Sequence, residues 1–329
     1  MERATALADL IPRAAKGETA AGAAILAMLA SGNPEDQLAT LRALNRVADA
    51  AFWGHTLEYL ATGRWGAVVV PGAPSGSQLH QTLQPKIRAL FLAAAGDGPS
   101  GRAREEALLR GVASPDLPIS CAAIDLVGGT GGPRAIEPLA AALRDSRQRV
   151  QLQAVRALGQ RGDARAVPAL VEALRSEDEL LAALAKDALV TIGPPALPAL
   201  SQVLDDQQAS DQVRWMAARA LARIGDARAI PTLIRHLNDA NYGLRWLAAE
   251  GLVALGAAGL RALLPALTTQ PVTPWLADSA AHVLRHARPP AVKEIVKPVL
   301  EALRSVDAEW AAPTAASRAV EELDAKGLL

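Results

Sequence analysis

The side chains best suited to chemistry gather on one predicted helix near the end of the chain. An indole, a carboxylate and two imidazoles follow one another at i, i+3, i+7 and i+11, so a helix places them on one face: Trp275, Asp278, His282 and His286. A metal site needs three or more converging ligands. Two histidines one turn apart therefore predict a solvated, hydrogen-bonded pair, and we expect neither a metal ion nor catalytic residues here. Glu250, in the preceding helical segment, is placed to approach Asp278 and His282.

Tryptophan placement gives a second signal, because the chain holds six Trp but only two Tyr and two Phe. Trp215 and Trp246 occupy the same place in successive segments, and Trp275 and Trp310 are assigned to the matching place in the next two. One column of indoles predicts either a binding strip, since Trp is favoured in binding hot spots, or a packing niche shared by neighbouring repeats. In the packing alternative the rings stack under arginines as cation–π contacts, with Arg214 and Arg245 as the partners.

Other residues of chemical interest favour structural roles. Cys121 lies in an Ala-rich helical segment and is predicted to be a small buried filler rather than a reactive thiol. Charged residues that recur with the repeat predict a structural ladder between neighbours: Asp163, Arg165, Asp226, Arg228, Arg214 and Arg245. No catalytic constellation and no cofactor motif is recognisable.

Composition describes an ordinary globular protein: 329 residues, 50% hydrophobic, with mean hydropathy +0.14. Lys plus Arg number 34 and Asp plus Glu number 34, which disfavours a nucleic-acid partner because phosphate binding needs clustered excess positive charge. The single cysteine indicates a reducing compartment. The start has no secretory pattern, and the apolar run 20–30 is too short to span a bilayer, so we expect a cytoplasmic protein with no membrane partner.

An internal repeat defines the architecture. Two nearly identical heptapeptides, Gly-Asp-Ala-Arg-Ala-Val-Pro from Gly162 and Gly-Asp-Ala-Arg-Ala-Ile-Pro from Gly225, lie 63 residues apart, and glycines at 131, 193 and 256 complete a series with a period of 31 or 32. Each unit carries a short apolar helix with an early proline, as in 166–174 and 229–237, and then a second helix, as in 213–224 and 244–255. We call these helices A and B. Such pairs cannot bury their apolar faces alone and must stack.

The turn and helix A pattern Gly-Asp-x-x-Ala-x-Pro-x-Leu, together with Val-Arg-x-x-Ala-Ala-x-Ala-Leu in helix B, resembles the short HEAT-like repeats named after phycobilisome lyases. This resemblance implies an all-α fold, an α-solenoid or alpha-alpha superhelix in which B helices line the concave side. It predicts a repeat array over 100–290 and a degenerate capping repeat over 291–329. Residues 1–99 are predicted to form an atypical helical cap, with helices over 35–61 and 84–95 and a Gly/Pro-rich loop over 65–81.

These patterns predict a non-enzymatic scaffold or adaptor that binds a protein or peptide partner along the concave groove. The candidate contact residues are Trp215, Trp246, Trp275, Trp310, Glu250, Asp278 and His282. The resemblance leaves two alternatives open. One is a bilin-chromophore lyase-like subunit, and the other is a DNA glycosylase or DNA-binding protein built from HEAT-like repeats, against which the neutral charge counts.

Overall fold

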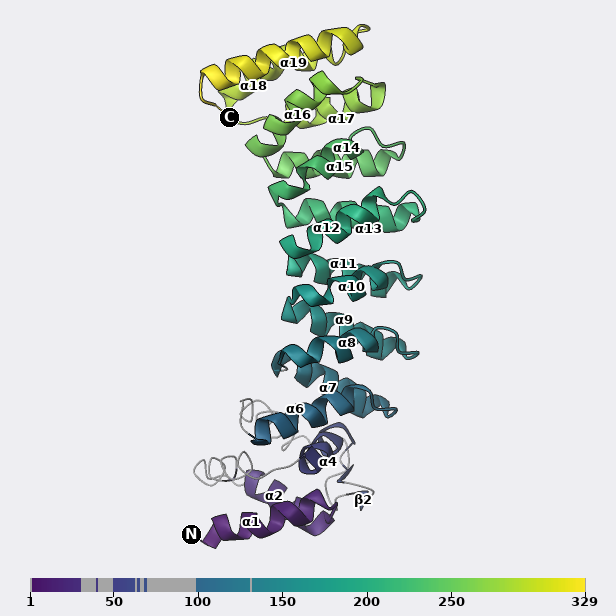
Figure 1. Cartoon of the computed structure of the whole chain (residues 1–329), viewed down its shortest axis with the longest axis vertical. Helices are drawn as coiled ribbons and strands as arrows, with labels where there is room; N and C mark the ends of the chain where they lie inside the picture. Colours follow the sequence, from purple (N-terminus) through teal and green to yellow (C-terminus); the bar gives the residue numbers. More distant parts are fainter. Residues whose placement is uncertain are drawn as a thin grey trace. The chain divides into compact units, whose positions relative to one another are not determined.

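The computed structural model describes residues 2–30, 40, 50–62, 64–65, 68–69, 99–130 and 132–328. The chain divides into two compact units, Met1–Ala166 and Val167–Leu329. Both units are built mainly of helices, labelled along the chain in Figure 1. The predicted all-α solenoid is confirmed, because short A helices and longer B helices alternate from α8 to α15 and helix pairs continue to α19.

The first unit begins with irregular helices and ends in regular repeats. Its core is centred on Trp53, Phe52 and Tyr59, whose side chains are fully buried. Its elements are α1 Glu2–Ala15, α2 Thr19–Ala30, α4 Ala50–Thr62, β1 Arg64–Trp65, β2 Val68–Val69, α6 Pro99–Val112, α7 Leu117–Thr130, η1 Pro133–Ala135, α8 Ile136–Ala142, α9 Gln148–Arg161 and η2 Ala164–Ala166.

Helix α4 confirms the end of the helix predicted over 35–61, and most of the rest of that range lies outside the described residues. The predicted helix over 84–95 also lies outside them, as does most of the predicted loop 65–81. At the start of that loop the structure places β1 antiparallel to β2, with Arg64 paired to Val69 and Trp65 to Val68. The Val-rich sequence explains this short pairing.

The second unit is the more regular of the two. A 3-10 turn precedes several of its A helices, and B helices pack on B helices of neighbouring repeats. Its elements are α10 Val167–Leu174, α11 Glu179–Ile192, η3 Pro194–Ala196, α12 Leu197–Asp205, α13 Asp211–Ile224, η4 Ala227–Ala229, α14 Ile230–His236, α15 Tyr242–Ala254, α16 Ala257–Thr269, α17 Pro274–Arg285, α18 Pro290–Ala302 and α19 Ala308–Ala325.

The repeated Gly-Asp turn closes each B helix by the same chemistry. Gly162 and Gly225 have φ of 63° and 64°, a left-handed conformation that glycine adopts without steric cost. Asp226 Oδ1 then accepts the backbone N–H of Arg228 at 2.9 Å, and the Arg228 guanidinium donates to both carboxylate oxygens. The predicted ladder between neighbours is therefore wrong for these turn residues, since each arginine pairs with the aspartate two positions before it. Asp163 and Arg165 form the equivalent pair in the first unit.

The beginnings of the B helices in the second unit fix the register of the repeat. At α11, α13, α15 and α17 the N-cap side chain accepts a backbone N–H of the first turn, which satisfies donors that the helix itself leaves free. These N-caps lie 32, 31 and 32 residues apart and are Asp178, Ser210, Asn241 and Thr273. Positions in different B helices are therefore compared by counting from the N-cap.

The B helices are buried on more than one side, as α13 shows. Ala217, Ala220 and Leu221 lie on one stripe of α13 and are fully buried. Ala218, which lies outside that stripe, is also fully buried. The physical reason is that α13 packs against the B helices α11 and α15 as well as against its own A helix α12, so its flanks are covered too.

No single helix in the described part of the chain is both long and apolar enough to cross a bilayer. One pair, Glu179–Ile192 with Pro194–Asp205, meets the length and composition test only when taken together, and it is bent by 118°.

Candidate functional site

Counting from the N-caps separates the tryptophans into two levels. Trp215 and Trp246 each lie five residues after their N-caps, whereas Trp275 lies two residues after Thr273 and Trp310 three after Asp307. The prediction of a single column of indoles is therefore wrong in register. The second pair is displaced by about one helical turn toward the N-terminal ends of the B helices. The error arose because the sequence pattern aligned the indoles rather than the caps.

At the junction between α13 and α15, the tryptophan of α13 packs on the next B helix. Trp215 is half-buried and lies over the start of α15, where a Cβ placed on Gly243 would be 3.6 Å from its Cδ1 atom. The Arg219 guanidinium lies 5.0 Å from the centre of the Trp215 ring. Trp215 therefore follows the packing alternative, with Arg219 rather than Arg214 as its cation–π partner.

Arg214 instead forms a buried ion pair at the same junction. Its side chain is 6% exposed and that of Asp239 is 9% exposed, and the two groups are hydrogen-bonded. Nε of Arg214 also donates to the Leu204 carbonyl at 3.1 Å, and His236 Nδ1 lies 3.0 Å from the same Asp239 oxygen. The predicted structural ladder is confirmed for Arg214, because this pair joins a B helix to the loop of the next repeat.

The Asp239 carboxylate is stabilised in its ionised form by these neighbours. Burial alone raises its pKa, but hydrogen bonds from the Asn241 backbone N–H, His236 and Arg214 outweigh burial, so the pKa lies below its ordinary value. A charge on Asp239 is thus part of the folded state. Removing it leaves the buried Arg214 facing Asp211, an exposed side chain whose Oδ1 lies 3.7 Å from Nη1 of Arg214.

The junction between α15 and α17 differs at both of these positions. Thirty-two residues after Gly243 and Asp239 stand Trp275 and Pro271. Arg245, which follows its N-cap by the same count as Arg214, has no carboxylate to meet and donates to the carbonyls of Asp239 and Ala240 at 2.7 and 3.0 Å. Its guanidinium carbon lies 5.2 Å from the centre of the Trp275 ring and 5.6 Å from that of Tyr242. The predicted cation–π role is thus confirmed for Arg245.

The indoles at this junction remain open to solvent. Trp246 is 46% exposed and Trp275 is 48% exposed. Beside Trp246 lies a small pocket of about 130 Å³ between α15 and α17. Its lining residues are Tyr242, Arg245, Trp246, Ala249, Asp278, Ser279, His282 and Arg285.

An ion pair crosses this junction at the edge of the pocket. His282 Nε2 lies 2.6 Å from Glu250 Oε1, as the sequence predicted for Glu250 and His282. Both side chains are partly exposed, and His286 Nδ1 lies 2.9 Å from the His282 carbonyl. The pairing of Glu250 with Asp278 is not found among the described contacts. Asp278 instead lines the pocket without an ion pair in the described part of the chain.

Metal and thiol chemistry gain no support from the geometry. Within the described residues no group of three or more His, Cys, Asp or Glu side chains converges as a metal site would require. Cys121 is buried, and burial raises the pKa of its thiol, which disfavours the reactive thiolate. The prediction that Cys121 is a small buried filler is confirmed.

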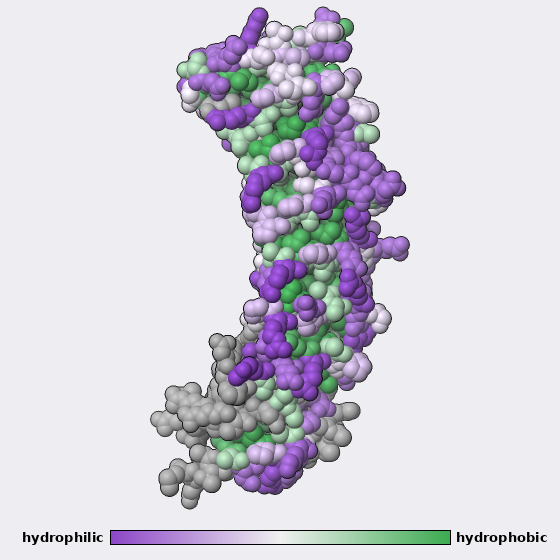
Figure 2. Space-filling model, viewed as in Figure 1, coloured by the Kyte–Doolittle hydropathy of each residue, from purple (hydrophilic) through white to green (hydrophobic). Residues whose placement is uncertain are grey.

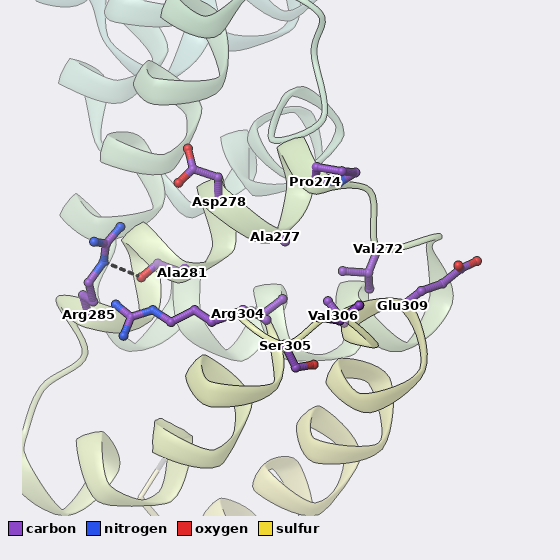
Figure 3. A pocket seen from close by; sticks show the side chains of 12 residues that line it. Val272, Pro274, Ala277, Asp278, Ala281, Arg285, Arg304, Ser305, Val306 and Glu309 are labelled. Atoms are coloured by element: carbon purple, nitrogen blue, oxygen red, sulfur yellow. Dashed lines mark hydrogen bonds between the residues drawn. The ribbon is translucent and has the colours of Figure 1, made fainter.

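A larger pocket of about 510 Å³ lies on the other side of α17 (Figure 3). It is bounded by α17, by the start of α19 and by the loop between α18 and α19, where Val306 is fully exposed. Trp310, 76% exposed, is adjacent in sequence to the lining residue Glu309. Sequence reasoning missed this pocket because its wall combines two helices with the segments before α17 and after α18, and no periodic motif marks Arg285, Arg304 or Val306.

Figure 2 shows where hydrophobic and polar side chains reach the surface. Hydrophobic groups appear between the helices of the second unit, and polar groups gather along the edge where the loops from A to B helices lie.

Residues 136–211 and 197–287 match the model of a family described as HEAT repeats. The sequence resemblance to HEAT-like repeats is thereby confirmed for this stretch. No curated protein matches the chain.

Several solved structures are similar to this chain at low identity. Importin beta is 12% identical with a TM-score of 0.44, covering 97% of this chain and 49% of its own. The CpcE and CpcF complex of phycocyanin lyase from Nostoc sp. PCC7120 is 20% identical with a TM-score of 0.35, covering 70% of this chain and 97% of its own. A designed armadillo repeat protein in complex with the peptide (KR)4 is 20% identical with a TM-score of 0.34, covering 62% and 99%. This chain spans about half the length of importin beta.

Proposed function

We propose that the chain, which matches the HEAT-repeat model over residues 136–211 and 197–287, is a non-enzymatic scaffold or adaptor that binds a protein or peptide partner along the B-helix face of α15, α17 and α19. One observation carries this proposal. Of the six large hydrophobic side chains that are exposed among the described residues, five lie between α15 and α19. They are Tyr242, Trp246, Trp275, Val306 and Trp310. Exposed apolar side chains that gather in one region, rather than singly, are typical of interaction sites.

The geometry suits a partner rather than a small substrate. Both pockets are open at the surface, and α17 separates them, so an extended segment could contact both by crossing α17. Indoles beside such pockets supply large contact area at low cost in side-chain entropy. Arg245 holds the Trp275 ring by cation–π contact, which fixes this indole before binding and lowers the entropy lost on association.

The test compares capture of partners by the wild-type chain and by the variant Trp246→Ala/Trp275→Ala/Trp310→Ala. A protein recovered from native lysate by the wild type is purified, and its Kd for both chains is measured directly. We expect the variant to bind at least about tenfold more weakly, because each truncated hot-spot residue costs about 1 kcal/mol or more.

The matched control is Leu180→Ala, which removes another exposed large side chain from α11, away from the pockets. Circular dichroism establishes that both variants are folded. Equal affinity of the folded triple variant and the wild type for every recovered protein would reject the proposed surface. Free bilin and a DNA duplex, offered to the wild type in the same assay, test the two alternatives that the sequence left open.

A further inference from the structure

We propose that the pocket between α17 and α19 binds an acidic side chain of a peptide segment, held between Arg285 and Arg304. This inference rests on the proposed function and specifies the chemistry of the partner. Arg285 ends α17 and Arg304 follows α18, so different helices bring the two guanidinium groups to one pocket. Figure 3 shows both arginines along one side of the pocket, with Glu309 at the opposite end.

The Arg285 side chain is already oriented for an anion. Its Nε donates to the Ala281 carbonyl at 3.0 Å, which anchors the arm to the helix and leaves both terminal nitrogens for another acceptor. A planar guanidinium with two free N–H groups matches a carboxylate as a bidentate donor.

Neither arginine has a carboxylate partner within the described part of the chain. Asp278 and Glu309 line the same pocket, yet neither forms an ion pair with Arg285 or Arg304 there. Two like charges that share a pocket repel each other, and an anion between them removes that repulsion. The two arginines and the two carboxylates of the lining balance in number, but the arginines lie together on one side of the pocket and Glu309 lies at the opposite end. The positive charge is therefore local to the arginine side, which is where an acidic group would bind.

The floor of the pocket specifies what should flank that acidic group. It is apolar and formed by side chains at most 8% exposed: Val272, Ala277, Ala281 and Leu303. Val306 adds an exposed apolar wall. A volume of about 510 Å³ holds more than a single carboxylate, so the fitting occupant is an acidic residue with an aliphatic neighbour.

The experiment is a selection from a phage-displayed random dodecapeptide library on the immobilised full chain. Enriched peptides are synthesised with a fluorescent label, and their Kd values are measured by fluorescence anisotropy. We expect enriched sequences to share an Asp or Glu next to an aliphatic residue. Replacing that acid by its amide should weaken binding about tenfold, as should Arg285→Glu/Arg304→Glu.

The matched control is Arg261→Glu/Arg318→Glu, which makes the same change in net charge at exposed arginines outside the pocket and should leave Kd within about twofold. The neutral variant Arg285→Gln/Arg304→Gln separates loss of the donors from added repulsion. Asp278→Asn should tighten binding, because it removes a negative charge from the pocket wall.

The outcomes separate this inference from the proposed function. Peptides that depend on Trp246, Trp275 and Trp310 but carry no acidic residue would overturn the inference alone. Acidic peptides whose affinity is equal for the wild type and the Arg285→Glu/Arg304→Glu variant would overturn it as well. Failure to enrich any peptide would reject peptide binding and this inference together.

Discussion

The α13–α15 and α15–α17 junctions are built on one repeat pattern and serve different ends. In the first, Gly243 leaves room for Trp215, and Asp239 neutralises Arg214. In the second, the corresponding positions hold Trp275 and Pro271. The first junction therefore has a half-buried indole and a buried ion pair, while the second leaves indoles exposed beside a pocket. Two positions of the repeat thus distinguish a junction with a buried ion pair from one with exposed indoles.

The largest expected difference concerns the buried ion pair. Asp239→Ala removes the buried partner of Arg214 and leaves it with the exposed Asp211 at 3.7 Å, and breaking a buried pair costs about 3–5 kcal/mol. The free energy of unfolding should fall by that amount in urea titrations followed by circular dichroism. The double variant Arg214→Met/Asp239→Leu should recover most of the loss, because neither charge then remains buried. If Asp239→Ala lowered the free energy of unfolding by less than about 1 kcal/mol, the buried ion pair would not distinguish the α13–α15 junction from the α15–α17 junction in stability.

The next difference separates Trp215 from Trp246. Trp215→Ala removes packing on the start of α15 and should destabilise the chain by about 2–3 kcal/mol, below the full cost of a buried aromatic because the ring is half-buried. Trp246→Ala should cost less than about 1 kcal/mol in stability but weaken partner binding. Thermal unfolding and Kd are measured on both variants. The reverse pattern, with stability lost at Trp246 and affinity lost at Trp215, would show that the two roles are exchanged.

A smaller effect is expected from the exposed pair that crosses the second junction. Glu250→Gln removes the charge that faces His282, and exposed ion pairs contribute about 0.2–1 kcal/mol. The free energy of unfolding should therefore change by no more than that, and 0.5 M salt should reduce the difference further. The measurement is a urea titration of both chains at low and high salt. If Glu250→Gln lowered the free energy of unfolding as much as Asp239→Ala, the Glu250–His282 pair would be a structural contact of the same kind as the Arg214–Asp239 pair.

The smallest expected effect is the acid titration of the repeat turns, which lie outside both junctions. Hydrogen bonds from Arg228 lower the pKa of Asp226 to about 2. Because the folded-state pKa lies below the ordinary value, the pair contributes stability above about pH 4, and this contribution is lost as pH falls toward 2. Carboxyl NMR titration should give a midpoint near 2 for Asp226 in the wild type. In Arg228→Gln that midpoint should rise toward the ordinary aspartate value, and an unchanged midpoint would contradict the assignment.

The sequence predicted the fold well because residues next to each helix end determine where the helices of the repeat begin and end. The Gly-Asp turn at Gly162 and Gly225 and the early prolines of the A helices mark helix ends directly. The contact between Glu250 and His282 was also predictable, since both lie on facing B helices. What failed was the alignment of Trp275, because the N-caps Asn241 and Thr273 keep the repeat spacing of 32 residues whereas Trp246 and Trp275 lie only 29 residues apart. The position of an indole in its helix is read from the N-cap and not from the repeat length. Pairing within the Gly-Asp turn and the pocket around Arg304 depend on side-chain directions that periodicity does not encode.

The two pockets beside α17 have a common wall, since Asp278 and Arg285 line both. A partner that occupies one pocket changes the electrostatic surroundings of the other through these side chains. Contributions to affinity from the two pockets are therefore coupled, and single substitutions at Trp246 and Arg304 should not add up to the effect of the double variant. In the proposed function, the two pockets on either side of α17 therefore form a single binding surface, whose two halves contribute to affinity in a coupled way.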